Sequence, residues 1–222
     1  MKFFYSIVGA VCIAVFLISA SVYIIFFNNN GNGFSKCRAG QVAGNIGGSF
    51  SLINEDGIVV TDIDVIKGPS LIYFGYTFCP DICPLDTYRN AEAVTLLEED
   101  GYDVTPIFIT FDPVRDTPEV LKQFTDYMHP KMVGLTGSID EIKKVAKKYR
   151  VYFKKQNTDD PENYLVDHTA FTYLVLPGIG FVDFFRRELT AEQLAEKVSC
   201  FIKVLAVEQN ISKFLKYRIL IQ

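Results

Sequence analysis

The chain has 222 residues, of which 49% are apolar and 22% are charged, and its formal net charge is −4. This is the composition of an ordinary globular protein with enough apolar material for one sizeable core. Lys2 is the one charged residue among the first 27, so the rest of the chain is mildly acidic. A mildly acidic chain lacks the basic surface that binds nucleic acid, and we expect no nucleic-acid partner.

The N-terminal segment is strongly apolar. Residues 7–27 carry no charge and are dominated by Ile, Val, Phe and Ala. As a helix they would span about 32 Å, against about 30 Å for the hydrocarbon core of a bilayer. A cleaved signal peptide, cut near Ser19-Ala20-Ser21, is the alternative, but its apolar region is usually about 7–15 residues long. We therefore predict an uncleaved membrane anchor at 1–27, with the following domain in a periplasm or intermembrane space.

A polar stretch separates this anchor from the remainder. Residues 28–33 contain only Asn and Gly, which is typical of a flexible tether. We expect the tether to cover residues 28–46, a single folded domain to cover 47–207, and a short tail to cover 208–222.

The folded domain alternates strands and helices. An Asp-Gly pair at 56–57 lies between apolar runs and predicts a hairpin. Helix starts are marked by Thr117-Pro118 and by capping boxes at Ser138 and Thr190. In chain order we expect a hairpin at 49–53 and 58–60, a strand at 71–76, a helix at 84–99, a strand at 104–111, helices from 118 and 139, a hairpin at 171–176 and 181–185, and a helix from 191. Strands joined by helices should be parallel, and the last hairpin antiparallel.

Of five cysteines, only Cys79 and Cys83 have motif spacing. Pro84 suits the first position of a helix, so we expect Cys79 in a loop and Cys83 at a helix start, where unpaired N–H groups favour thiolate. Cysteines between the first core strand and its helix indicate an α/β domain with a thioredoxin-like fold. They suit redox exchange or a soft metal, and two inert packed cysteines are the alternative. Cys37 could be free or pair between chains, whereas Cys200 is expected to be structural.

The residues around His168 extend this motif. Asp167-His168-Thr169 directly precedes a predicted core strand, where a thioredoxin-like oxidoreductase would place a cis-proline. Two thiolates and an imidazole form a soft, three-coordinate set that suits copper, while structural zinc would require a fourth ligand. A hydrogen-bonded structural histidine is the alternative. Asp167 could orient the imidazole, or it could cap a turn.

Two charged clusters have open interpretations. Residues 112–116, Asp-Pro-Val-Arg-Asp, follow a strand at the edge where thioredoxin-like folds keep their active site. They could present acidic residues to a partner, or form a salt-bridged turn and helix cap. A basic cluster reads as a solvated helix face, with partner docking as the alternative. It consists of Lys143, Lys144, Lys147, Lys148, Arg150, Lys154 and Lys155.

Four segments closely resemble the Sco/SenC family. They are residues 74–84, 108–118, 134–137 and 164–168. The resemblance runs from about residue 47 to 205, although Thr169 stands where Ser is common and Leu176 where the family usually has Asp. It implies a membrane-anchored thioredoxin-fold protein that helps assemble the copper site of cytochrome c oxidase. It also implies that Cys79, Cys83 and His168 bind copper, taken from an upstream copper donor and passed to the copper-bearing oxidase subunit.

Two other functions would use the same residues. A thiol–disulfide oxidoreductase could keep the oxidase cysteines reduced, using Cys79 and Cys83 as its redox pair, with His168 tuning thiolate character. A redox or copper sensor would bind the metal without transferring it. Stoichiometric transfer of copper to the oxidase would distinguish a chaperone from both.

Overall fold

The computed structural model describes residues 13–17, 19–21, 33–38, 45–157, 160 and 163–219, with side chains in the last helix described as far as residue 207. The chain divides into two units, one of residues 40–202 and one of residues 1–39 with 203–222. Within the described residues, no helix is both long and apolar enough to cross a membrane. The predicted anchor lies outside that part of the chain except for 13–17 and 19–21, which are helical.

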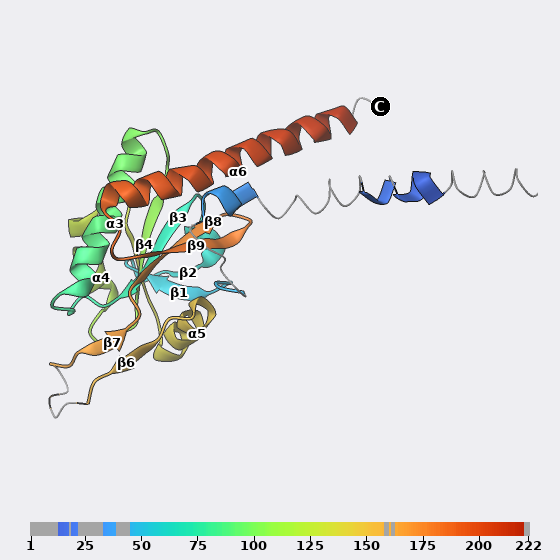
Figure 1. Ribbon diagram of the computed structural model, residues 1–222. Helices are drawn as coiled ribbons and strands as arrows, with labels where there is room; N and C mark the ends of the chain where they lie inside the picture. The colour runs from blue at the N-terminus through green and yellow to red at the C-terminus, as the bar shows by residue number, and fades with distance from the viewer. Residues whose placement is uncertain are drawn as a thin grey trace, which may run out of the picture. The chain divides into compact units, whose positions relative to one another are not determined.

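The larger unit is built on a seven-stranded sheet in the order β2-β1-β5-β4-β3-β8-β9 (Figure 1). The three central strands β5, β4 and β3 are parallel, and the strands outside them pair antiparallel. The prediction that strands joined by helices are parallel is confirmed for β3 and β4, and the closing hairpin of β8 and β9 is antiparallel as predicted. The strands are β1 (Ser51–Asn54), β2 (Val59–Thr61), β3 (Ser70–Gly75), β4 (Thr105–Thr110), β5 (Val133–Thr136), β8 (Phe171–Leu176) and β9 (Gly180–Arg186).

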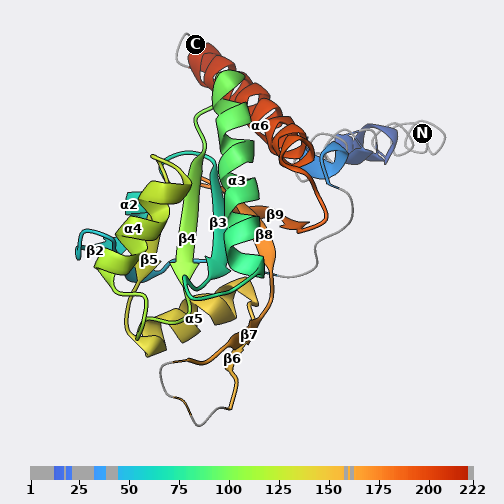
Figure 2. The same ribbon diagram turned by 90° about the vertical axis from the view of Figure 1, so that its left-hand side faces the viewer.

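Helices cover both faces of this sheet (Figures 1 and 2). Neighbouring residues of β3 point to opposite faces, as the pleat requires. The Tyr73 hydroxyl donates to Asp86 of α3 (Ile82–Glu99), whereas the Phe74 ring lies 5.4 Å from the ring of Tyr149 in α5 (Ile139–Tyr149). On the same face as α3, Phe108 of β4 packs against Phe124 of α4 (Pro118–Met128), with their ring centres 4.8 Å apart. All six residues of β3 are therefore buried.

The predicted helix starts are confirmed by their caps. The Thr117 side chain accepts a hydrogen bond from the Val120 N–H, with Pro118 as the first helical residue of α4. Ser138 and Glu141 form the predicted capping box of α5, and Thr190 caps α6 (Ala191–Ile219) by exchanging hydrogen bonds with Gln193. A short helix α2 (Asp62–Val65) and a 3₁₀ turn η2 (Gly33–Lys36) were not predicted.

The sequence-based prediction also missed three strands. The first is β5, which is only four residues long and contains Gly134, so it carries little strand signal. The others, β6 (Phe153–Lys155) and β7 (Val166–His168), pair antiparallel in a separate two-stranded sheet. Because these strands are short and partly charged, they lack a clear alternation of apolar and polar residues. Strand β7 matters most, since it carries His168.

Candidate metal centre

The two motif cysteines lie where the main sheet meets α3. Strand β3 ends at Gly75, and a turn in which the Cys79 N–H donates to the Tyr76 carbonyl (3.3 Å) leads to the helix. Helix α3 begins at Ile82, two residues before the predicted start, so Cys83 lies in its first turn. The Cys83 N–H points at the Cys79 sulfur, 3.4 Å away. Cys79 is 9% exposed and Cys83 is fully buried.

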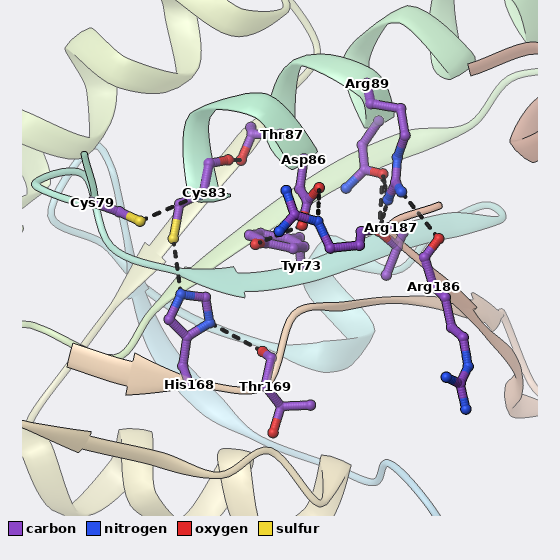
Figure 3. A network of polar contacts seen from close by, with 12 residues as sticks. Tyr73, Cys79, Cys83, Asp86, Thr87, Arg89, His168, Thr169, Arg186 and Arg187 are labelled. Carbon is purple, nitrogen blue, oxygen red and sulfur yellow. Dashed lines mark hydrogen bonds and ion pairs between the residues drawn. The ribbon is translucent and has the colours of Figure 1, made fainter. Parts of the chain in front are cut away.

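His168 comes from the other sheet and faces these sulfurs (Figure 3). Its Nε2 lies 3.3 Å from the Cys83 Sγ, and its Nδ1 lies 3.1 Å from the Thr169 carbonyl oxygen. A carbonyl can only accept, so Nδ1 carries a proton and donates to it, which leaves Nε2 facing the sulfurs. The ring packs 4.8 Å from the ring of Phe111.

Asp167 does not orient this imidazole. Strand alternation turns it away from His168, and its exposed carboxylate accepts a hydrogen bond from the Gln156 side chain (2.6 Å). The group that fixes the ring is the backbone carbonyl of Thr169. The interpretation of Asp167 as the orienting residue was therefore wrong, and a sequence pattern offers no signal for a backbone acceptor.

Cys79, Cys83 and His168 form a compact set of possible ligands. Their Sγ, Sγ and nitrogen atoms all lie within 4.8 Å of one another, and they are the one such group found among the residues that the structure describes. Both cysteines have free thiols, whereas Cys37 and Cys200 are disulfide-bonded, which excludes the free-thiol alternative for Cys37. Two soft sulfurs and one imidazole are a donor set that could hold copper.

The two thiols share one proton. A hydrogen bond from the Cys83 side chain holds the pKa of Cys79 far below its ordinary value, with further help from His168 and the N–H groups of Asp81 and Cys83. The same pairing, together with burial, raises the pKa of Cys83. At neutral pH the pair is therefore a Cys79 thiolate beside a Cys83 thiol.

A buried polar cluster lies behind Cys83 (Figure 3). The Tyr73 hydroxyl donates to the Asp86 carboxylate (3.2 Å), and the Arg187 Nε lies 3.8 Å from the same group. Burial raises the pKa of Asp86, although the nearby Arg89 and Arg187 oppose this. No sequence signal marks this cluster, because Tyr73 lies in an apolar run and Asp86 in a helix with little amphipathic pattern.

The other predicted clusters are structural or solvent-exposed. Asp112 and Asp116 are 5% and 0% exposed, so they do not present acidic groups to a partner. The Asp112 carboxylate forms an ion pair with the Arg115 Nε (2.6 Å), which is the salt-bridged turn of the alternative interpretation. The lysines of α5 are exposed, as expected of a solvated face.

Comparisons with known proteins agree with this arrangement. The SenC protein of Rhodobacter capsulatus is 48% identical over 199 residues, which are 89% of this chain and 90% of SenC. The crystal structure of Arabidopsis thaliana ScoI with copper bound has 42% identity and a TM-score of 0.68, covering 71% of this chain and 99% of ScoI. BsSco is described as a member of the Sco family of cytochrome c oxidase assembly proteins with a disulfide switch. Its solved structure has 26% identity and a TM-score of 0.57, and the match covers 73% of this chain and 96% of BsSco. The sequence profile of the SCO1/SenC family matches residues 38–203, and with the identity to SenC this shows that the chain belongs to the SCO1/SenC family.

Proposed function

We propose that this protein is a copper chaperone, which binds copper through Cys79, Cys83 and His168 and delivers it to the copper site of cytochrome c oxidase during assembly. The observation that carries the proposal is the convergence of two free thiols and one imidazole within 4.8 Å. The copper bound by Arabidopsis ScoI and the description of BsSco as an oxidase assembly protein support it.

The donor set suits a metal that has to be released again. Sulfur favours Cu(I), and the imidazole nitrogen also allows Cu(II). Three protein ligands leave room for an incoming ligand of the recipient, so that one bond can be exchanged at a time. Cys79 retains 9% exposure, whereas Cys83 is fully buried and must lose its proton when copper binds.

We further propose that residues 1–27 anchor the protein to a membrane, with the copper-binding domain in a periplasm or intermembrane space. The described residues of this segment are helical, and Ile13, Phe16 and Leu17 are exposed, as lipid-facing side chains would be. Alkaline extraction of membranes tests the proposal. The full chain should remain with the membrane, and a variant that lacks residues 2–27 should be released.

Copper titration of the reduced full chain tests the binding site. The parent should bind one copper ion per chain, and the variants Cys79→Ala, Cys83→Ala and His168→Ala should each bind more weakly. His129→Asn is the matched control, because it changes the only other histidine in the sequence. In the parent the His129 Nδ1 accepts a hydrogen bond from the Lys131 N–H, and the Asn side-chain oxygen can accept the same bond. Parent-like Cu(II) binding by the His168 variant would exclude the proposed site.

A thiol–disulfide oxidoreductase remains the second candidate function. The low pKa of Cys79 favours it, because a thiolate is the attacking species in thiol–disulfide exchange. In this reaction the Cys79 thiolate would attack a disulfide of the substrate, Cys83 would resolve the mixed disulfide, and the chain would end oxidised. Catalytic turnover on an oxidised oxidase fragment with added reductant would support this function. Transfer of one copper ion per chain without turnover would support the chaperone.

A further inference from the structure

The three candidate ligands lie on two separately hydrogen-bonded parts of the domain. Cys79 and Cys83 follow β3 of the main sheet, whereas His168 ends β7 of the two-stranded sheet. No backbone ladder joins these two sheets within the described residues. Apart from the short link through Thr169 and Ala170 to β8, the distance between sulfur and imidazole therefore depends on side-chain contacts.

One short turn contacts both parts. Residues 112–116 follow β4, and the N–H groups of Arg115 and Asp116 both donate to the Asp112 carbonyl (3.2 and 3.0 Å). The Asp112 N–H donates to the Thr110 hydroxyl at the end of the strand (2.9 Å). These hydrogen bonds fix the backbone of the turn that carries the Asp112 and Asp116 side chains.

Asp116 holds the cysteine loop. Its carboxylate accepts from the Thr77 N–H (3.0 Å) and from the Thr77 hydroxyl (2.5 Å), and Thr77 lies two residues before Cys79. A third hydrogen bond comes from the Thr110 hydroxyl (2.5 Å). Asp116 is fully buried, so it has no solvent to replace these partners if they are lost.

Asp112 holds the segment that leads to the histidine. Its carboxylate accepts from the Tyr164 hydroxyl (2.5 Å), and Tyr164 lies four residues before His168. The Arg115 guanidinium pairs with this carboxylate and lies 3.6 Å from the centre of the Tyr164 ring. Tyr164 is 6% exposed, so this is a buried connection between the turn and the segment that precedes β7.

We propose that the turn of residues 112–116 is the positioning element of the metal centre. Asp116 fixes the cysteine loop through Thr77, and Asp112 fixes the histidine strand through Tyr164. Sulfur and imidazole are thereby held at ligand distance before copper arrives. This inference rests on the proposed copper binding, but the positioning itself exists in the metal-free protein and can be measured there.

The two arms of the turn have different expected effects on copper. Loss of the Tyr164 hydroxyl in Tyr164→Phe frees the histidine side, so Cu(II) affinity should fall about tenfold, as expected for loss of a hydrogen bond to a charged group. Cu(I) affinity should change less, because two sulfurs satisfy that ion. Loss of the Thr77 hydroxyl in Thr77→Val frees the cysteine side, so the affinities for both ions should fall.

The experiment compares the reduced full-length parent, Tyr164→Phe, Asp112→Asn and Thr77→Val. Anaerobic Cu(I) and Cu(II) titrations give the affinities, and nitrogen coupling in the electron paramagnetic resonance spectrum of bound Cu(II) reports His168. Amide hydrogen exchange of residues 163–168 without metal should be about tenfold faster in Tyr164→Phe and Asp112→Asn. Tyr173→Phe is the control, since it removes the hydroxyl of another buried tyrosine away from this turn.

The outcomes separate the inference from the proposed function. Parent-like exchange, nitrogen coupling and Cu(II) affinity in both Tyr164→Phe and Asp112→Asn would overturn the positioning role. The double variant should lose less than the sum of the two single variants, because Tyr164→Phe removes this hydrogen bond and Asp112→Asn removes the charge that strengthens it. Fully additive losses would also overturn the positioning role. If the parent binds no copper, the proposed function fails, and the exchange rates still decide whether the turn holds β7.

Discussion

The main sheet and the two-stranded sheet supply different ligands and are held in different ways. The cysteines follow β3, whose residues are all buried between hydrogen-bonded neighbours β4 and β8. The histidine lies on β7, which pairs only with the three residues of β6. The main sheet is fixed by its ladders and core, whereas the small sheet depends on a few side chains. The candidate metal centre thus joins a part of the protein with an extensive backbone ladder to a part with a short one.

This difference suggests how copper could be released. Small displacements of β6 and β7 would move the imidazole away from the sulfurs without disturbing the main core. The proposed chaperone function needs such a ligand, because one bond must open before the recipient can replace it. The comparison can be tested by damaging each part in turn.

Damage to the core of the main sheet should have the largest effect. Phe108 is fully buried and packs 4.8 Å from Phe124. Phe108→Ala should lower the free energy of unfolding by about 3–5 kcal/mol, because it leaves a cavity. Urea unfolding followed by circular dichroism measures this loss. A decrease below about 1 kcal/mol would mean that the main sheet is less tightly packed than the structure indicates.

Damage to the small sheet should reduce metal binding more than stability. The Phe153 ring in β6 stacks on the Phe111 ring, with a distance of 5.3 Å between the ring centres. The centre of the Phe111 ring lies 4.8 Å from that of the His168 ring. Phe153 is only half-buried, so Phe153→Ala should lower the free energy of unfolding by less than about 2 kcal/mol. Cu(II) affinity should nevertheless fall roughly tenfold, as is usual when a group supporting a ligand is lost.

The exposed neighbour Tyr152 provides the control for this variant. Its side chain is 60% exposed, so Tyr152→Ala should leave both stability and Cu(II) affinity close to those of the parent. Equal loss of copper affinity in the two variants would show that Phe153 has no particular role in supporting His168.

The cysteines should differ in reactivity. The low pKa of Cys79 means that its thiolate already predominates at pH 7, so its alkylation rate by iodoacetamide should stay flat between pH 7 and 9. An ordinary thiol would react up to about ten times faster for each added pH unit in this range. Cys83 is fully buried and has a raised pKa, so it should be labelled more than about tenfold more slowly. Peptide mass spectrometry after timed quenching distinguishes the two sites, and equal labelling would contradict the shared proton.

The sequence predicted the main sheet better than the small one. Runs such as residues 104–111 and caps such as Thr117 and Ser138 are local signals, and the structure confirmed them. Strands β6 and β7 carry no such signal, because contacts distant in sequence hold them. The convergence of Cys79, Cys83 and His168 was expected from the place of His168 before a core strand of a thioredoxin-like fold and from the family resemblance. Spacing alone cannot bring a histidine 85 residues away to Cys83.

The groups that support the ligands could not be predicted in the same way. The residues that α3 buries near its N-terminal end include the polar Asp86, Thr87 and Asn90, so the helix shows little apolar periodicity. The roles of Asp112, Asp116 and Tyr164 depend on long-range hydrogen bonds, which a single sequence does not reveal. For residues 112–116 the sequence therefore leaves partner contact and a salt-bridged turn equally open, and only the burial of Asp112 and Asp116 decides between them.

The smallest expected effect is that of Asp167→Asn, which separates proximity in sequence from contact in space. Asp167 adjoins His168, but its carboxylate is exposed and accepts a hydrogen bond from Gln156, the residue after β6. The substitution should change the free energy of unfolding by less than about 0.5 kcal/mol, and Cu(II) affinity should stay within about twofold of the parent. Calorimetric titration of Asp167→Asn and Tyr164→Phe with Cu(II) measures the affinities of the two variants on one scale. A tenfold loss in Asp167→Asn would mean that this carboxylate, and not the Thr169 carbonyl, orients the imidazole.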